Sequence, residues 1–143
     1  MYEYYVRKVE NVVDGDTIDV LIDLGFDILF QSRVRLAGID TPESRTKDLA
    51  EKALGLESKE YLKKQLKDAK SVVIKTEKMN SSEKYGRILG WVYLNGDTVS
   101  LNDKMINDGY AWGYLGDTKV KDFELLAKVR LKSGKWKKAL IAN

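Results

Sequence analysis

The sequence contains no cysteine and no histidine, and it has a single proline among its 143 residues. Without cysteine, disulfides, iron–sulfur clusters and thiol nucleophiles are excluded. Without histidine, a Ser-His-Asp triad and nearly every transition-metal site are excluded as well. An enzyme of this composition must work with carboxylates, lysine, arginine, tyrosine or hydroxyl groups. Any metal that it uses should be a hard cation with oxygen ligands.

The sequence also has no apolar run that approaches the roughly 18 residues of a membrane-spanning helix. It is 43% hydrophobic and 33% charged, so we expect residues 1–143 to form a single soluble domain that has no membrane association. The N-terminal residues lack the features of a signal peptide. The default expectation is a cytoplasmic protein, or a secreted one if a leader has been removed. No feature indicates an oligomer, and a monomer is the default.

The formal net charge of +3 is unevenly distributed along the sequence. Residues 1–70 carry 12 basic and 14 acidic side chains, which gives −2, whereas residues 71–143 carry 13 basic and 8 acidic ones, which gives +5. A mildly basic surface suits an anionic partner but does not identify one.

Alternating hydrophobicity predicts three strands in the first 40 residues, over 4–13, 17–23 and 28–39. Thr41-Pro42 should end the third strand, because proline has no amide hydrogen to donate and restricts the residue before it. The polar segment 44–55, which closes with Gly55, is interpreted as a mobile loop. Apolar residues at helical spacing then predict a helix over 56–69.

Further strands are predicted at 71–76 and 88–94, and Asn95-Gly96-Asp97 is typical of a hairpin turn that leads into a short strand at 98–99. A short helix should begin at Ser100 and end at Gly109, and a last helix should cover 123–131. This order of elements predicts an α+β protein, specifically a five-stranded oligonucleotide-binding (OB-fold) β-barrel with about three helices.

Three segments carry residues with chemical potential: Asp14-Gly15-Asp16-Thr17, the run Arg35-Leu36-Ala37-Gly38-Ile39-Asp40-Thr41-Pro42-Glu43, and Lys84-Tyr85-Gly86-Arg87. Each segment taken alone is compatible with an ordinary turn or loop. Together they complement one chemistry. Two aspartates could share one Ca²⁺ or Mg²⁺ with a backbone carbonyl and water, two arginines match phosphate oxygens, and a glutamate could position or deprotonate water. These are the groups that phosphodiester hydrolysis needs.

In their order and separations, the three segments resemble the signature segments of the staphylococcal nuclease (thermonuclease) family. The closing pattern of Ala127, Arg130, Gly134 and Trp136 is similar to that family's C-terminal helix, so the resemblance covers nearly the whole chain. It implies an OB-fold barrel. It also implies Ca²⁺-dependent, sequence-nonspecific hydrolysis of DNA and RNA, with a preference for single strands and with 3′-phosphate products.

The resemblance further implies a metal site. Asp16 and Asp40 correspond to carboxylates that bind Ca²⁺, and the carbonyl of Thr41 corresponds to a further ligand. Asp14 matches an acidic residue that does not bind the ion itself but orients water there.

Catalytic and substrate-binding roles follow from the same resemblance. Arg35 and Arg87 match arginines that hold the scissile phosphate, and Glu43 matches the glutamate proposed as general base. Two further residues match those that contact the neighbouring phosphate of a bound nucleotide, namely Lys84 and Tyr85.

The aromatic segment near residue 112 departs from the family pattern. We choose Tyr114 for stacking on a base, which would tolerate any sequence, and assign Trp112 to the core. The alternative function is a non-catalytic nucleic-acid-binding OB-fold module. Non-catalytic relatives that contain Tudor domains have lost the acidic and arginine positions, which this sequence retains. A purely structural protein would require three such segments to arise by chance in the same order.

Overall fold

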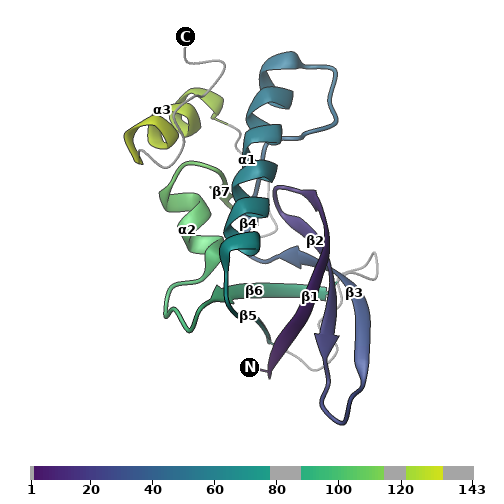
Figure 1. The fold of residues 1–143 in the computed structure, drawn as a ribbon. Coiled ribbons are helices and arrows are strands. Elements are labelled where there is room, and N and C mark those ends of the chain that lie inside the picture. The colour runs from purple at the N-terminus through teal and green to yellow at the C-terminus, as the bar shows by residue number, and fades with distance from the viewer. Residues whose placement is uncertain (1, 78–87, 115–121, 134–143) are drawn as a thin grey trace.

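The computed structural model describes residues 2–77, 88–114 and 122–133, and its central feature is a closed β-barrel (Figure 1). Its strands follow the spatial order β1-β2-β3-β6-β5, with bounds β1 Tyr2–Asp14, β2 Thr17–Asp23, β3 Leu29–Leu36, β5 Val72–Thr76 and β6 Ile88–Leu94. A separate pair joins β4 (Ile39–Asp40) to β7 (Trp112–Gly113). The described helices are α1 (Leu49–Asp68), α2 (Leu101–Asn107) and α3 (Phe123–Ser133). The predicted α+β barrel is therefore confirmed.

The barrel interior is built from alternate residues of its strands. Ile18, Val20 and Ile22 on β2 are almost completely buried, and Val34 and Leu36 on β3 are fully buried beside them. The antiparallel register pairs Ile18 with Val34, so the apolar sides of both strands face the same way. This alternation is the one that the sequence predicts, because side chains on a strand point to opposite faces in turn.

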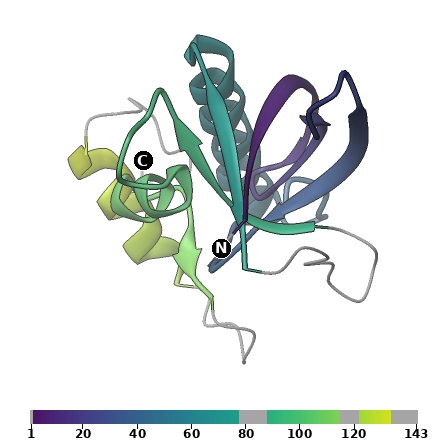
Figure 2. The same ribbon diagram turned by 90° about the horizontal axis from the view of Figure 1, so that it is seen from below.

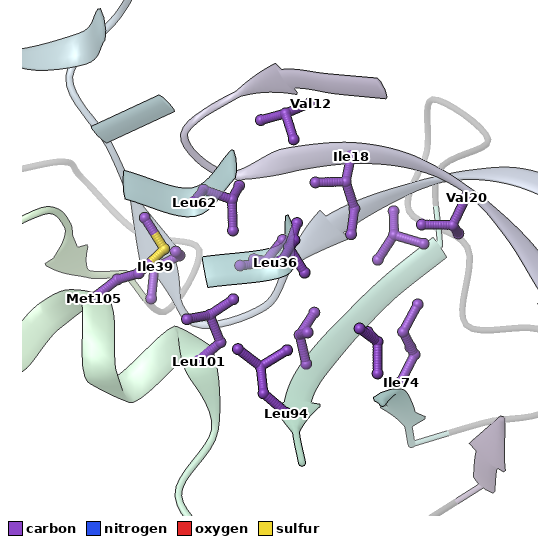
Figure 3. Close-up of a cluster of buried hydrophobic side chains, with 14 of the residues drawn as sticks. Val12, Ile18, Val20, Leu36, Ile39, Leu62, Ile74, Leu94, Leu101 and Met105 are labelled. Atoms are coloured by element: carbon purple, nitrogen blue, oxygen red, sulfur yellow. The ribbon is translucent and has the colours of Figure 1, made fainter. Parts of the chain in front are cut away.

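Two helices close the core. Figure 3 shows Leu62 of α1 and Leu101 and Met105 of α2 directed toward the same cluster as Ile18 and Leu36 of the barrel. Ser100 caps α2 by accepting a hydrogen bond from the amide of Asp103. At the other end of α2, Gly109 adopts a left-handed conformation with φ of 83°. Both predicted ends of this helix are thus confirmed.

The expected strand over 28–39 is interrupted at Ala37 and Gly38. Gly38 has φ of 74°, a conformation that glycine adopts without the steric cost of a side chain. Asn102 of α2 fixes this turn by donating from Nδ2 to the carbonyl of Ala37 at 2.7 Å. Beyond the turn, Ile39 and Asp40 leave the barrel and pair with β7. This break directs Asp40 toward the candidate site.

Helix α1 begins at Leu49, whereas the sequence predicted a loop as far as residue 55. Asp48 caps the helix, since its carboxylate accepts hydrogen bonds from the amides of Ala50 and Glu51. Gly55, which was interpreted as the end of a loop, lies inside the helix. Within the described ranges, no helix is long and apolar enough to cross a membrane.

The predicted hairpin after β6 is wrong in its second half. Asn95 and Gly96 do form the turn, both with positive φ, but residues 98 and 99 form no strand. On one edge of β6, β5 pairs with Trp91 to Leu94. On the other edge, β3 pairs only as far as Gly90, and beyond it the amide of Val92 donates to Asn102 Oδ1 of α2 at 3.0 Å, so a returning strand finds this amide already bonded. Asn95 instead bonds across to the start of β5, where its side-chain oxygen accepts from the amides of Lys70 and Ser71.

Helix α3 is attached to α1 through a buried charge. Both views place α1 between the β2–β3 hairpin on one side and α2 and α3 on the other (Figures 1 and 2). Arg130 of α3 is fully buried, forms an ion pair with Glu57 of α1 and donates to Ser58 Oγ at 3.0 Å. Its guanidinium also lies 4.1 Å from the ring centre of Tyr110. Removal of the Arg130 side chain would therefore eliminate all of these contacts at once.

We expect Arg130→Met to lower the free energy of unfolding by about 3–5 kcal/mol, because the substitution leaves the Glu57 carboxylate buried without its cation. Guanidinium denaturation measures this loss. The control is Arg33→Met, which breaks an exposed ion pair with Asp19 and should cost at most about 1 kcal/mol. Equal losses in the two variants would contradict the structural role of Arg130.

A second prediction concerns alkaline pH. Burial, together with the hydrogen bond that Tyr61 donates to Asp108 at 2.7 Å, raises the pKa of Tyr61 well above its usual value. The unfolded chain ionises this tyrosine near pH 10 and the folded chain does not. The contribution of Tyr61 is therefore complete below pH 10, and stability falls above it by up to about 1.4 kcal/mol per pH unit. Thermal melts between pH 9 and 11.5 should show a shallower decline for Tyr61→Phe, whereas the exposed control Tyr5→Phe should follow the parent protein.

Candidate active site

Six of the predicted site residues line one cavity of about 340 Å³. They come from three places in the fold: the turn between β1 and β2, the end of β3, and β4 with the loop that follows it. In chain order these residues are Asp14, Asp16, Arg35, Asp40, Thr41 and Glu43. The structure thus brings together side chains that are separated by up to about 30 positions in the sequence.

Arg35 lies at the centre of this cavity wall, and only 11% of its side chain is exposed. It donates hydrogen bonds of 2.9 Å to the carbonyls of Leu36 and Ile39, which hold the guanidinium in place. Its terminal nitrogens lie 3.6 Å from Asp16 Oδ2 and 3.8 Å from Asp40 Oδ1. A single guanidinium therefore lies between two carboxylates and reduces their mutual repulsion.

The two carboxylates next to Arg35 are held by local backbone geometry. Asp16 follows Gly15 in the turn before β2, and its Oδ1 accepts a hydrogen bond of 2.9 Å from Thr17 Oγ1. Its carbonyl accepts from the amide of Leu36, which ties this turn to the end of β3. Asp40 is positioned by the pairing of β4 with β7. Both side chains are mostly buried, with 14% and 8% exposed.

Asp14 contacts the loop after β4. Its Oδ1 accepts a hydrogen bond of 2.7 Å from Ser44 and lies 4.0 Å from Arg45 Nε. Ser44 is buried, so this bond connects the β1–β2 turn to the segment that carries Glu43. Sequence reasoning missed both Ser44 and Arg45, although their position immediately after Glu43 in a polar segment was a usable signal.

Glu43 lies at the exposed rim of the cavity, and its backbone is held against helix α1. The amide of Glu43 donates to Glu51 Oε2 at 3.1 Å. A Cβ atom at Gly55 would lie 2.5 Å from both the carbonyl carbon and the oxygen of Glu43, which is too close for any other residue. Gly15 allows a similar approach, since a Cβ there would lie 2.9 Å from Ser58 Cβ of α1 and 3.1 Å from Thr41 Oγ1. No sequence signal distinguished these two glycines from turn or linker glycines.

The donor atoms suit a hard cation. Asp16 and Asp40 supply carboxylate oxygens in the same cavity wall, and Thr41, which is buried, follows Asp40 directly. Among the residues that the structure describes, no group of three or more acidic side chains is arranged to hold a metal ion. A cation bound to the two aspartates would therefore take its remaining ligands from backbone oxygens and water, which Ca²⁺ accepts readily.

Four predicted residues are not part of the described cavity wall. Lys84, Tyr85 and Arg87 lie outside the described residues. Tyr114 follows β7, and its amide donates to the carbonyl of Gly38 at 2.8 Å, but it does not line the cavity. Trp112 is half-buried and packs edge-on against Phe123, with 5.4 Å between the ring centres. It thus contacts α3 rather than the main core.

The fold and cavity define a class: an OB-fold barrel with an acidic cavity around a central arginine. Comparison with known proteins gives the family. The family described as Staphylococcal nuclease homologue matches residues 33–140, well over half of the chain, and the chain belongs to this family.

Three relatives illustrate the similarity. The chain is 29% identical over 136 residues to a thermonuclease of Staphylococcus hyicus, an alignment that covers 95% of this chain and 75% of the relative. It is 37% identical over 114 residues to a micrococcal nuclease of Shigella flexneri, which covers 75% and 57%. It is 39% identical over 103 residues to an uncharacterised protein of Bacillus anthracis, which covers 72% and 44%. The chain thus spans only about half of the length of the last two relatives.

The close contact at Gly55 leads to a prediction. Gly55→Ala should lower the free energy of unfolding by about 1–2 kcal/mol, because the clash with the Glu43 backbone outweighs the roughly 1 kcal/mol that alanine gains in a helix. Urea denaturation measures the change. Gly113→Ala is the matched control, since a Cβ there meets no atom within 4 Å and should change little. A more stable Gly55→Ala protein would show that α1 does not approach the loop this closely.

Proposed function

We propose that this protein is a Ca²⁺-dependent nuclease that hydrolyses phosphodiester bonds of DNA and RNA without sequence preference and leaves 3′-phosphate ends. The observation that carries the proposal is the convergence of Asp16, Arg35, Asp40 and Glu43 on one cavity in a member of the staphylococcal nuclease family. The names of two relatives, thermonuclease and micrococcal nuclease, agree with this chemistry.

Formation of a 3′-phosphate requires that a water oxygen attacks phosphorus and that the bond from phosphorus to the 5′ oxygen breaks. In the proposed mechanism, Glu43 at the cavity rim takes the proton from that water. The position of Glu43 depends on its backbone contact with α1, so the carboxylate reaches the cavity from a fixed loop. The leaving 5′ oxygen takes a proton from solvent water and departs as a hydroxyl group, and Glu43 returns the proton that it accepted to solvent.

Arg35 is the proposed phosphate-binding group. Two of its five N–H groups donate to the carbonyls of Leu36 and Ile39, which leaves three for other acceptors in the cavity that Arg35 lines. A guanidinium fixed in this way donates to phosphate oxygens without reorganising as charge develops on them. Arg87, which lies outside the described residues, is proposed to act with it.

Asp16 and Asp40 would hold the cation, together with the carbonyl of Thr41, and Asp14 would order water next to it through its position beside Ser44. When bound, Ca²⁺ supplies positive charge that offsets both these carboxylates and the phosphate. We further propose a monomer that prefers single-stranded substrates and stacks a base on Tyr114.

The test is a time course of cleavage of labelled single-stranded DNA and RNA with Ca²⁺, with Mg²⁺ and with chelator. Cleavage should require Ca²⁺, and Glu43→Gln should lower the rate by about 10²–10⁴-fold. Arg35→Lys should lower it by about 10²–10³-fold, because a lysine cannot reproduce the planar fork. Asp40→Asn should abolish both cleavage and the rise in melting temperature that Ca²⁺ causes in the parent protein.

The matched control is Asp19→Asn, which removes a carboxylate from β2 outside the cavity and should leave cleavage intact. Full activity in chelator, or in both Glu43→Gln and Arg35→Lys, would contradict the mechanism. Tight, calcium-independent binding of an oligonucleotide that is never cut would instead indicate a non-catalytic binding module.

A further inference from the structure

A second, larger cavity of about 540 Å³ lies between β1 and the C-terminal half of α1. Its walls include the apolar side chains of Val9, Leu66 and Val72. Four exposed lysines surround these apolar residues, one from β1, two from α1 and one from the segment that follows α1: Lys8, Lys63, Lys67 and Lys70. We call this cavity the lysine cleft.

The cleft exists because the barrel closes over only part of β1. Strand β5 pairs with β1 at Tyr2 to Tyr5, and β2 pairs with the other edge of β1 as far as Asp14. Beyond Tyr5, the edge of β1 that faces away from β2 has no strand beside it within the described ranges, and α1 packs there instead. Backbone groups and lysines are thus presented on the same surface.

The surface cations in the described part of the chain are of two kinds. Some form ion pairs, as in Arg33 with Asp19, Lys75 with Glu3, and Lys104 with Asp97. Others, such as Lys59 and Lys128, form none within the described ranges, and the cleft gathers four lysines of this second kind on one surface. Even Arg7, which also lines the cleft, pairs with Asp23 at 3.1 Å. None of the four lysines forms an ion pair with any residue that the structure describes.

The acid and the helix end at the cleft do not cancel this charge. Glu10 lines the cleft and keeps its negative charge, since its partner Gln31 at 2.9 Å is a neutral donor. The described lining nevertheless holds five cations against this one carboxylate, a net charge of +4. The C-terminus of α1 attracts cations, which accounts for a lysine in its last turn at position 67. That attraction falls off within a turn, so it does not account for Lys8 on β1 or for Lys63.

The catalytic cavity has the opposite charge. Its described walls carry four carboxylates and two guanidiniums, a net charge of −2 before any cation binds. A polyanion gains little attraction from such a surface, and most of the affinity of proteins for nucleic acid comes from cations near the phosphates. The described walls of the cavity therefore supply no net attraction for a polyanion, whereas the lysine cleft presents a positively charged surface outside the cavity.

We propose that the lysine cleft binds the phosphate backbone of nucleic acid at a distance from the bond that is cut. This inference rests on the proposed function for the choice of a nucleic acid as the polyanion. Gly55 marks the point on α1 that contacts Glu43 of the catalytic cavity. Lys67 of the cleft lies 12 residues further along the same helix, which is a distance of about 18 Å. At the ~3.4 Å spacing of a duplex strand, this separation corresponds to about five nucleotides, and a more extended single strand spans it with fewer. Long strands should thus reach both places, and very short ones only the cavity.

The test compares the parent protein with Lys63→Gln/Lys67→Gln/Lys70→Gln. Binding of a fluorescent 15-nucleotide single strand is measured in chelator, where no cleavage is expected, over a series of salt concentrations. The triple variant should bind at least ~10-fold more weakly at low salt. Its salt dependence, expressed as the slope of log K against log salt, should be smaller by about 2, since each lost contact with a single strand removes ~0.7. With Ca²⁺, the KM for the 15-mer should rise, while cleavage of a trinucleotide should not change.

The matched control is Lys64→Gln/Lys104→Gln/Lys128→Gln, which changes the net charge equally outside the cleft. Unchanged binding in the cleft variant, or equal losses in both variants, would overturn the proposal. Competition by poly-glutamate as strong as that by unlabelled oligonucleotide would also overturn it, because the cleft would then recognise acidic protein equally well. A protein that binds through these lysines but never cleaves would support the cleft and contradict the nuclease.

Discussion

One turn of helix α1 fixes the geometry on which the rest of the site depends. Gly55 lets the Glu43 backbone lie against the helix, and Ser58 lies where a side chain at Gly15 would have to fit. The buried Arg130 of α3 bonds to the same turn through Leu54, Glu57 and Ser58. Because both site loops and α3 meet these few residues, a shift of this turn would move the carboxylates of the candidate site and helix α3 together.

The cavity keeps its acidic residues close at an electrostatic cost. Asp16 and Asp40 lie on either side of Arg35. Two hydrogen bonds to backbone carbonyls fix the guanidinium of Arg35, so it cannot move closer to either carboxylate. One arginine cannot neutralise both acids and also a phosphate, which supports the proposal that a cation binds here. The negative charge of the described cavity walls also supports the proposal that cations elsewhere on the surface contribute to binding nucleic acid.

The sequence predicted local features well and long-range features less well. The alternation of Ile18, Val20 and Ile22 depends only on neighbouring residues, and it is confirmed. The interpretation of Gly55 as the end of a loop was wrong. A glycine is required at this position because the helix touches the backbone of Glu43, which lies 12 positions earlier. The strand expected at 98–99 failed for a similar reason, since β5 pairs with one edge of β6 there and Asn102 of α2 bonds to the Val92 amide on the other. Tertiary contacts of this kind leave no periodic signal.

For the candidate site too, motifs within one segment were predicted well and contacts between distant segments were not. Motif reasoning placed Asp14, Asp16, Asp40 and Glu43 together, and they do line one cavity. It missed Ser44, which links two of the site loops through Asp14. The position of Ser44 directly after Glu43 was a signal, but its partner lies 30 positions earlier and could not be read from the sequence. The lysine cleft was missed for a related reason. Its lysines come from β1, from α1 and from the segment after α1. They reach one surface only because the pairing of β1 with β5 ends at Tyr5, which leaves the rest of that edge open to α1. Charge counted along the sequence made residues 1–70 acidic, whereas the fold separates that segment into an acidic cavity and a basic cleft at opposite ends of one helix.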